Sequence, residues 1–148
     1  MVPPLILVQL VLLLPGIVLP MSDDSFIHFP LSSPEDCVDW VPAREGEVPA
    51  AAFIADFTEK DGGHQGVYIG RAEHEGGKFP GTFLPALEKA FIAWGGKVHH
   101  KDHYEVLVEK SNLLQCRLVW INSRDGQLDD RAVIGGYTEN GEDIYIYL

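Results

Sequence analysis

The sequence predicts an all-β protein in which tandem β-repeats, related by a pseudo-twofold, form a sandwich-like domain. Three observations carry this prediction. Short segments rich in β-branched and aromatic residues recur at turn-rich spacing, and no long helix is evident. The 148 residues include 15 Gly and 10 Pro, which favour turns. Two stretches of twenty residues, 80 positions apart, are similar to each other.

Eight segments have the composition of short strands. The segment at 78–84 contains Pro80-Gly81, a pair that predicts a turn inside it. The segment at 87–94 fits either a helical turn or a strand, and Gly95-Gly96 ends it either way. Residues 99–103 contain three histidines and are expected to form a loop. The eight predicted strands are 51–57, 66–72, 78–84, 87–94, 103–109, 115–121, 131–137 and 143–148.

The internal repeat aligns Trp40–Glu59 with Trp120–Glu139. Seven of the twenty positions are identical, which is difficult to obtain by chance. The pattern indicates one β-unit used twice, with an aromatic anchor, a tight Gly turn, a buried strand, a second turn and a paired strand. Two such units commonly bury their apolar faces against each other. The second copy stops at Leu148, about where the first reaches Ile69, so an incomplete second repeat is expected.

These features predict a linear organisation. Residues 1–20 form a hydrophobic leader and 21–39 a polar leader. Residues 40–109 form the first repeat, 110–119 a connecting strand and 120–148 the partial second repeat.

The leader is apolar from residue 5 to 19 except for Gln9. That length fits the hydrophobic region of a signal peptide and is shorter than the ~20 residues of a membrane span. A secreted protein is therefore expected, or a membrane-anchored one if the leader is not cleaved. The alternative is a start at Met21, before polar residues, which predicts a cytoplasmic domain.

The charge and the cysteines limit the partners. The formal net charge of −11 repels polyanions, so no nucleic-acid partner is expected. Cys37 and Cys116 precede the two matched tryptophans, and they form either one disulfide or two core thiols.

Several short motifs in the chain are characteristic when taken together. They resemble the DM-nine repeat family, which also occurs beside pore-forming domains in natterin-like proteins. The resemblance covers Trp40 to Leu148. It implies tandem β-repeats with a pseudo-twofold and, from characterised members, mannose-type glycan recognition in invertebrate immune settings. The motifs are Gly46-Glu47-Val48-Pro49 with Ala52, Tyr68-Ile69-Gly70-Arg71-Ala72, His74-Glu75-Gly76, Pro80-Gly81, Gly95-Gly96-Lys97 with His99, and Tyr104-Glu105-Val106-Leu107.

The resemblance also implies a sugar site in which an Asp and a Lys hold the ligand. This sequence has Thr58 at the Asp position and Thr82 at the Lys position. A threonine offers one neutral hydroxyl in place of a charge-assisted hydrogen bond. The candidate carbohydrate site therefore comprises Thr58 and Thr82 with the charged neighbours Asp61, Arg71 and Glu75.

The expected function is carbohydrate binding by a mannose-type, lectin-like recognition protein in innate immunity. The alternative is a non-catalytic structural or interaction domain that has lost sugar binding.

An enzyme is not expected, because the sequence has no nucleophile elbow, phosphate loop or His-Glu-X-X-His motif. Arg71 and Glu75 are expected to contact each other or buried backbone groups. The histidines at 99–103 are interpreted as surface residues, and no metal or other cofactor is expected. An apolar, unpaired edge at 143–148 predicts a homodimer, and the alternative is that residues 22–34 fold over this edge within one chain.

Overall fold

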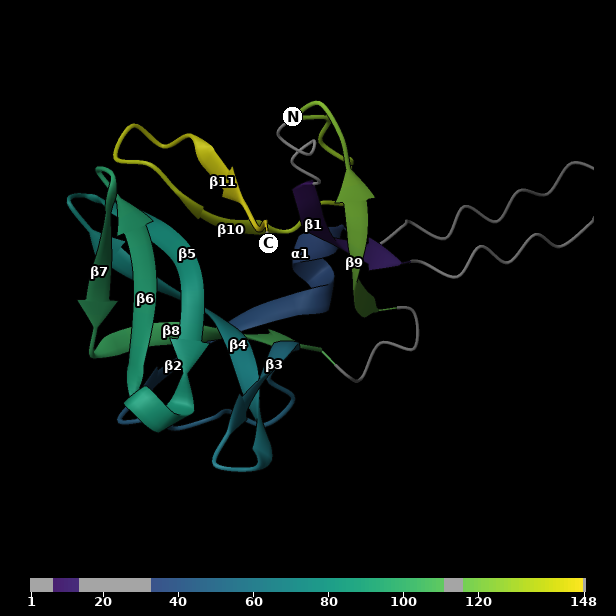
Figure 1. Ribbon diagram of the computed structural model, residues 1–148. Helices are drawn as coiled ribbons and strands as arrows, with labels where there is room; N and C mark the ends of the chain where they lie inside the picture. Colours follow the sequence, from purple (N-terminus) through teal and green to yellow (C-terminus); the bar gives the residue numbers. More distant parts are fainter. Residues whose placement is uncertain (1–6, 14–32, 111–115, 148) are drawn as a thin grey trace, which may run out of the picture.

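The computed structural model describes residues 7–13, 33–110 and 116–147 (Figure 1). The leader residues between these ranges, including the alternative start at Met21, lie outside the described residues. One short helix, α1 (Pro34–Cys37), and a 3-10 turn, η1 (Pro85–Leu87), accompany the strands. The strands are β1 (Leu7–Leu13), β2 (Val38–Arg44), β3 (Ile54–Lys60), β4 (Gly63–His74), β5 (Gly77–Leu84), β6 (Lys89–Trp94), β7 (Lys97–Lys101), β8 (His103–Glu109), β9 (Arg117–Ser123), β10 (Ile134–Tyr137) and β11 (Asp143–Tyr145).

Nine strands form one curled antiparallel sheet, and β1 pairs with β9 in a second sheet of two strands. The order β11-β10-β5-β4-β8-β2 runs through the large sheet. Two strands each change partner along their length. The first part of β4 pairs with β3 and a later part pairs with β8. Likewise, the first part of β5 pairs with β10 and the last part pairs with β6. Figure 1 shows β8 crossing the direction of β5 and β6 as the sheet curls. The prediction of an all-β fold is confirmed.

The two halves of the sequence repeat use the same backbone plan. Strands β2, β3 and β4 correspond to β9, β10 and β11. The turn at Glu45-Gly46 has φ values of 53° and 78°, and Asp125-Gly126 has 56° and 70°. Each turn closes with the same hydrogen bond, from Glu47 N–H or from Gln127 N–H, at 3.0 Å. The sequence repeat is therefore also a structural repeat.

Matched residues from the two copies meet in one hydrophobic core. Trp120 of the second copy packs against this core, and its Nε1 donates a hydrogen bond to the backbone carbonyl of Ala55 in the first copy, at 3.1 Å. A second core belongs to the first copy and centres on Phe83, Ile92 and Val106, all fully buried. The matched pairs at the first core are Val38/Leu118, Trp40/Trp120, Phe53/Val133 and Ile69/Ile146.

The disulfide between Cys37 and Cys116 links the starts of the two copies. Their Cα atoms lie 5.2 Å apart, and the bond closes a separation of 79 residues. The sequence left the redox state open, and the structure gives a disulfide.

Two local predictions are wrong. Pro80-Gly81 lies inside β5 and makes no turn, because Pro80 falls between the stretch of β5 that pairs with β10 and the stretch that pairs with β6. A proline is tolerated where no ladder hydrogen bond is required of its nitrogen. Residues 97–101 form β7 and not a loop, because Gly95-Gly96, with φ of 58° and 74°, makes a tight hairpin turn.

The ambiguous segment at 87–94 is mostly strand β6, preceded by η1. In the apolar leader, residues 7–13 form β1, which pairs antiparallel with β9. Among the described residues no helix is long and apolar enough to cross a membrane.

Candidate functional site

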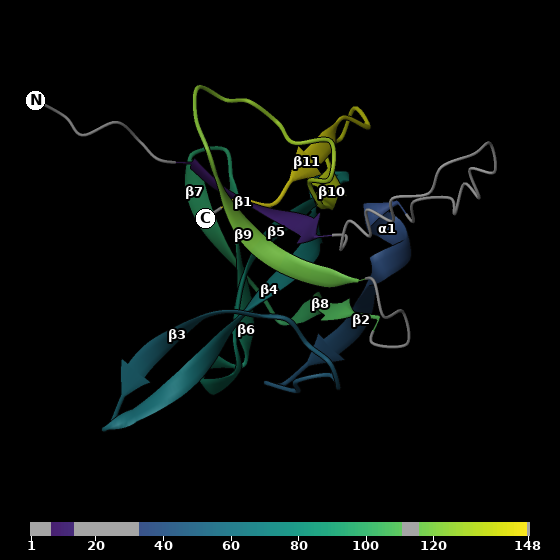
Figure 2. The ribbon, with the colours of Figure 1, turned by 90° about the vertical axis from the view of Figure 1, so that its right-hand side faces the viewer.

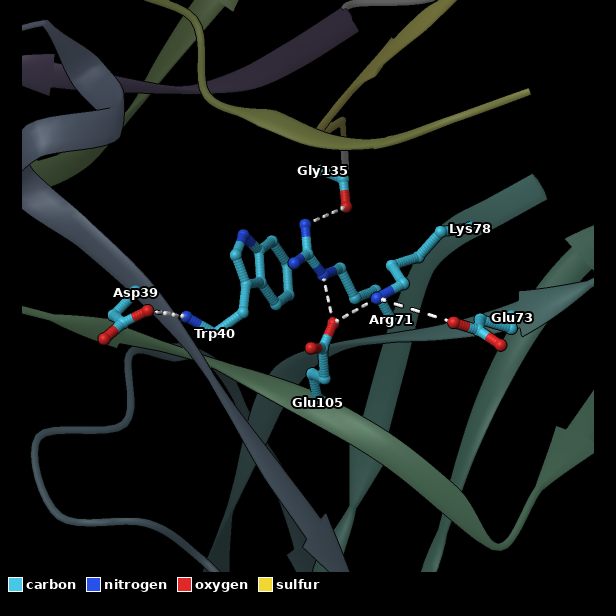
Figure 3. Close-up of polar contacts among 7 residues, drawn as sticks. All are labelled: Asp39, Trp40, Arg71, Glu73, Lys78, Glu105 and Gly135. Carbon is cyan, nitrogen blue, oxygen red and sulfur yellow. Dashed lines mark hydrogen bonds and ion pairs between the residues drawn. The ribbon is translucent and has the colours of Figure 1, made fainter. Parts of the chain in front are cut away.

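A cluster of charged side chains lies between the two copies (Figure 3). Arg71 on β4 donates a hydrogen bond from Nε to Oε2 of Glu105 on β8, at 2.6 Å. Lys78 on β5 donates to the same oxygen at 3.0 Å. The Arg71 guanidinium lies over the Trp40 ring, 4.2 Å from its centroid, and donates to the carbonyl of Gly135 at 3.5 Å. We call these five residues the Arg71 cluster.

The Arg71 cluster is largely shielded from solvent. The side chains of Arg71, Lys78 and Glu105 are 19%, 17% and 24% exposed. Burial alone raises the pKa of Glu105, but the hydrogen bonds from Arg71 and Lys78 outweigh it, so the pKa lies below its usual value. The carboxylate therefore stays ionised, with two cations on one oxygen.

This arrangement makes Arg71 a connector of the two copies, since Gly135 belongs to the second copy and Glu105 to the first. The expected contact between Arg71 and Glu75 is not observed, because Arg71 points to Glu105 across the strand pairing of β4 with β8. The expectation that Arg71 satisfies a backbone group is met by the carbonyl of Gly135.

We expect Arg71→Met to lower the free energy of unfolding by about 1–3 kcal/mol, because Glu105 loses one of its two cations and the stacking on Trp40 changes. Urea denaturation of both proteins measures the difference. Arg124→Met is the matched control, because Arg124 is exposed on the turn that repeats Arg44. Equal losses in the two variants would contradict the connecting role.

A polar hollow of about 490 Å³ opens beside the Arg71 cluster, and we call it the β4–β5 hollow. The turn between β4 and β5 forms one side, with Glu75 at φ 45° and Gly76 at φ 82°. Tyr137 of β10 belongs to the second copy, and it lies beside the hollow because its backbone pairs with that of Lys78 on β5. The lining residues are Glu73, His74, Glu75, Gly76, Gly77, Lys101 and Tyr137.

Aromatic and basic groups hold one wall of the hollow. The His74 ring lies 4.2 Å from that of His99 and edge-on to Trp94 at 5.1 Å, centroid to centroid. The Lys101 ammonium donates to the carbonyl of Glu73 at 2.8 Å and lies 3.0 Å from Nδ1 of His74. Partial burial first, and then the charge of Lys101 and the proximity of His99, lower the pKa of His74. A neutral His74 can accept the Lys101 hydrogen bond at Nδ1.

The predicted site residues do not gather in one place. Thr58 lies on β3 opposite Gln65, and Thr82 lies on β5 opposite Ile69. The two threonines therefore lie on opposite sides of β4. Their partners on β4, Gln65 and Ile69, are four positions apart, which is ~13 Å along the strand. Two threonine hydroxyls at that spacing do not contact one hexose.

Asp61 and Glu75 lie beyond opposite ends of β4. Asp61 is in the β3–β4 turn, beside a smaller hollow of about 360 Å³. Since β4 spans twelve residues, the two carboxylates are separated by roughly 35 Å or more along a straight strand. Among the predicted site residues only Glu75 lines the β4–β5 hollow.

Sequence reasoning missed Tyr137 and Lys101 as site residues. The repeat alignment pairs Tyr137 with Phe57, and an aromatic residue at the same strand end in both copies was the available signal. Nothing local in the sequence connects Lys101 to the β4–β5 turn. Within the described ranges no three His, Cys, Asp or Glu residues gather in a way that would hold a metal ion.

The fold and this hollow define a class, an all-β repeat protein that presents an open, polar surface site with an aromatic side chain at its border. A family model, DM9 repeat, matches residues 60–147, more than half of the chain. The chain belongs to the DM9 repeat family. No curated protein matches it.

Proposed function

We propose that this protein is a non-catalytic, mannose-type glycan-binding recognition protein of innate immunity, and that the sugar binds in the β4–β5 hollow. The observation that carries the proposal is the convergence of Glu73, Glu75, Lys101 and Tyr137 on one open polar surface. The family resemblance supplies the ligand class.

The groups in the hollow suit vicinal hydroxyls. Carboxylates accept and ammonium groups donate charge-assisted hydrogen bonds, which are stronger than neutral ones. The side chain of Glu73 is 82% exposed, and its carboxylate is 3.9 Å from Lys78, so it remains accessible to a ligand. Lys101 has two partners, Glu73 O and His74, which leaves one of its three hydrogens for a sugar oxygen.

Tyr137 supplies the apolar part of the site. It is 43% exposed, so its ring face can pack on the C–H face of a pyranose while its hydroxyl reaches water.

We expect Tyr137→Ala to weaken binding of an oligomannose ligand by about 5- to 30-fold, since an aromatic stacking contact contributes on the order of 1–2 kcal/mol. Glu75→Gln, which removes the charge and keeps the size, should weaken binding by a smaller factor. Isothermal titration calorimetry with oligomannose measures both.

The matched control is Phe57→Ala. Phe57 is the repeat counterpart of Tyr137, is 59% exposed, and lies on β3 outside the hollow. We expect its affinity to equal that of the unaltered protein. Equal affinities for Tyr137→Ala and Phe57→Ala would place the sugar elsewhere.

The second candidate is a structural or interaction domain that has lost sugar binding. The observation favouring it is that threonines replace the Asp and Lys implied by the family and lie apart across β4. A folded protein that binds no oligomannose in calorimetry would support this function over the first.

A further inference from the structure

The edge of β9 is covered by a strand from the N-terminal part of the chain. Residues 7–13 pair with residues 117–123 over seven consecutive positions, from Leu7↔Ser123 to Leu13↔Arg117. Figure 2 shows the two strands side by side along their whole length. Among the described strands β1 is the only partner of β9.

The pairing of β9 with β1 repeats the pairing of β2 with β8. Strand β2 is the counterpart of β9, and it is antiparallel to β8 over seven positions, as β9 is to β1. In the first copy Trp40 is opposite Leu107, and in the second Trp120 is opposite Leu10. The next register pairs also match, with Val108 of β8 in the place of Val11 of β1. With respect to β9, strand β1 therefore occupies the position that β8 occupies with respect to β2.

The counterpart strand has a large structural role in the first copy. Leu107 is fully buried in the core shared by the copies, and its carbonyl accepts a hydrogen bond from Phe53 N–H at 2.9 Å. Strand β9 brings Leu118, 4% exposed, and Trp120 to the same core. A bare edge on β9 would leave backbone donors and acceptors unpaired beside this core.

We propose that β9 is a strand-binding site whose occupant is residues 7–13 of the same chain, retained as an integral strand of the folded protein. The segment is apolar except for Gln9, which suits burial beside the core, and its two valines favour a strand. Twenty residues separate Leu13 from Pro34, a reach of up to ~70 Å when extended, so the length of the connection permits this pairing within one chain.

This arrangement assigns the leader a role other than targeting. Removal of residues 1–20 would take the occupant away and open the edge of β9. The mature protein is therefore expected to keep residues 7–13, whichever glycan it binds.

Disulfide trapping in the full chain tests the register. Two in-register pairs are made, Val11→Cys with Val119→Cys and Val8→Cys with Asn122→Cys. The two pairs cover both alternating pair types of an antiparallel ladder, whose Cα separations of ~4.5 and ~5.5 Å fall within the range of disulfides. The control is Val8→Cys with Val119→Cys, three positions out of register.

After oxidation we expect a cross-link at the mass of one chain in at least one in-register pair and little in the control, as mapped by mass spectrometry of peptides. A covalent dimer would overturn the assignment to the same chain. No cross-link, or one equally strong in the control, would overturn the site itself.

A second variant tests the strand without cysteines. Leu10→Pro with Val11→Pro removes two consecutive amide donors of β1, so one that faces β9 is lost whichever way the ladder alternates. We expect hydrogen exchange of the amides at 118–121 to accelerate by at least about 100-fold while Ile69 stays protected. The control, Ile17→Pro with Val18→Pro, also replaces two consecutive apolar residues with proline and lies outside β1. Unchanged exchange at 118–121 in the first variant would reject the proposal.

Discussion

Gly81→Ala will lower the free energy of unfolding by about 3 kcal/mol or more, or prevent folding, because β6 leaves no room for a methyl group. A Cβ at this position would lie 2.0 Å from the carbonyl oxygen of Phe91 and 3.0 Å from the Cα of Ile92. Both atoms belong to the backbone of β6, which is paired with β5 at this point. The neighbour cannot yield without separating the two strands. Urea denaturation or a thermal melt measures the loss.

The matched control is Gly63→Ala at the start of β4. A Cβ there would be 3.7 Å from the carbonyl of Lys60, an ordinary contact. We expect a change of less than about 0.5 kcal/mol, as at other permissive surface positions. If Gly81→Ala were as mild as Gly63→Ala, the close pairing of β5 with β6 would be incorrect.

Removing the disulfide is expected to have an effect of comparable size. Cys37→Ala with Cys116→Ala should lower the free energy of unfolding by about 4.5 kcal/mol on the loop-entropy model, given the separation of 79 residues. Denaturation curves with and without a reducing agent measure it. The unaltered protein should lose stability on reduction, whereas the double alanine variant should not respond.

An unaltered stability in reducing agent would contradict the disulfide. Because the bond ties the starts of β2 and β9, we also expect reduction to increase hydrogen exchange at β9 more than at β5.

Composition and repetition were sufficient to predict the fold class and the duplicated unit. The strand signals are local, since Val, Ile, Tyr and Phe in short runs depend little on distant partners. The sequence repeat also predicted that the turns at Gly46 and Gly126 are equivalent, because both positions have a positive φ, which glycine adopts without steric cost.

The wrong local predictions came from context that the sequence does not show. Pro80-Gly81 has the composition of a turn. In the structure, however, Gly81 lets the backbone of β6 approach β5 closely, and Pro80 lies between the residues of β5 that pair with β10 and those that pair with β6. Gly95-Gly96 was recognised as the end of the segment at 87–94, but the sequence did not show that a second strand, β7, follows directly as the partner of β6.

The candidate site was the least predictable part. Glu75 was identified, but its neighbours Lys101 and Tyr137 reach the β4–β5 hollow through β7 and through the pairing of β10 with β5. Arg71 was chosen as a sugar ligand for its charge, yet the tertiary structure places it against Glu105 and Gly135. Long-range pairings decide such positions, and no local pattern encodes them.

The β3–β4 hairpin offers a practical consequence for protein engineering. All side chains from Asp56 to His64 are exposed, and the segment between the matched positions Glu59 and Val67 is three residues longer than its counterpart between Glu139 and Ile144. An exposed loop tip that already differs in length between the two copies is a suitable insertion point. An affinity tag or a fluorophore-bearing peptide placed after Asp61 would lie outside both cores and beyond the far end of β4 from the proposed sugar site.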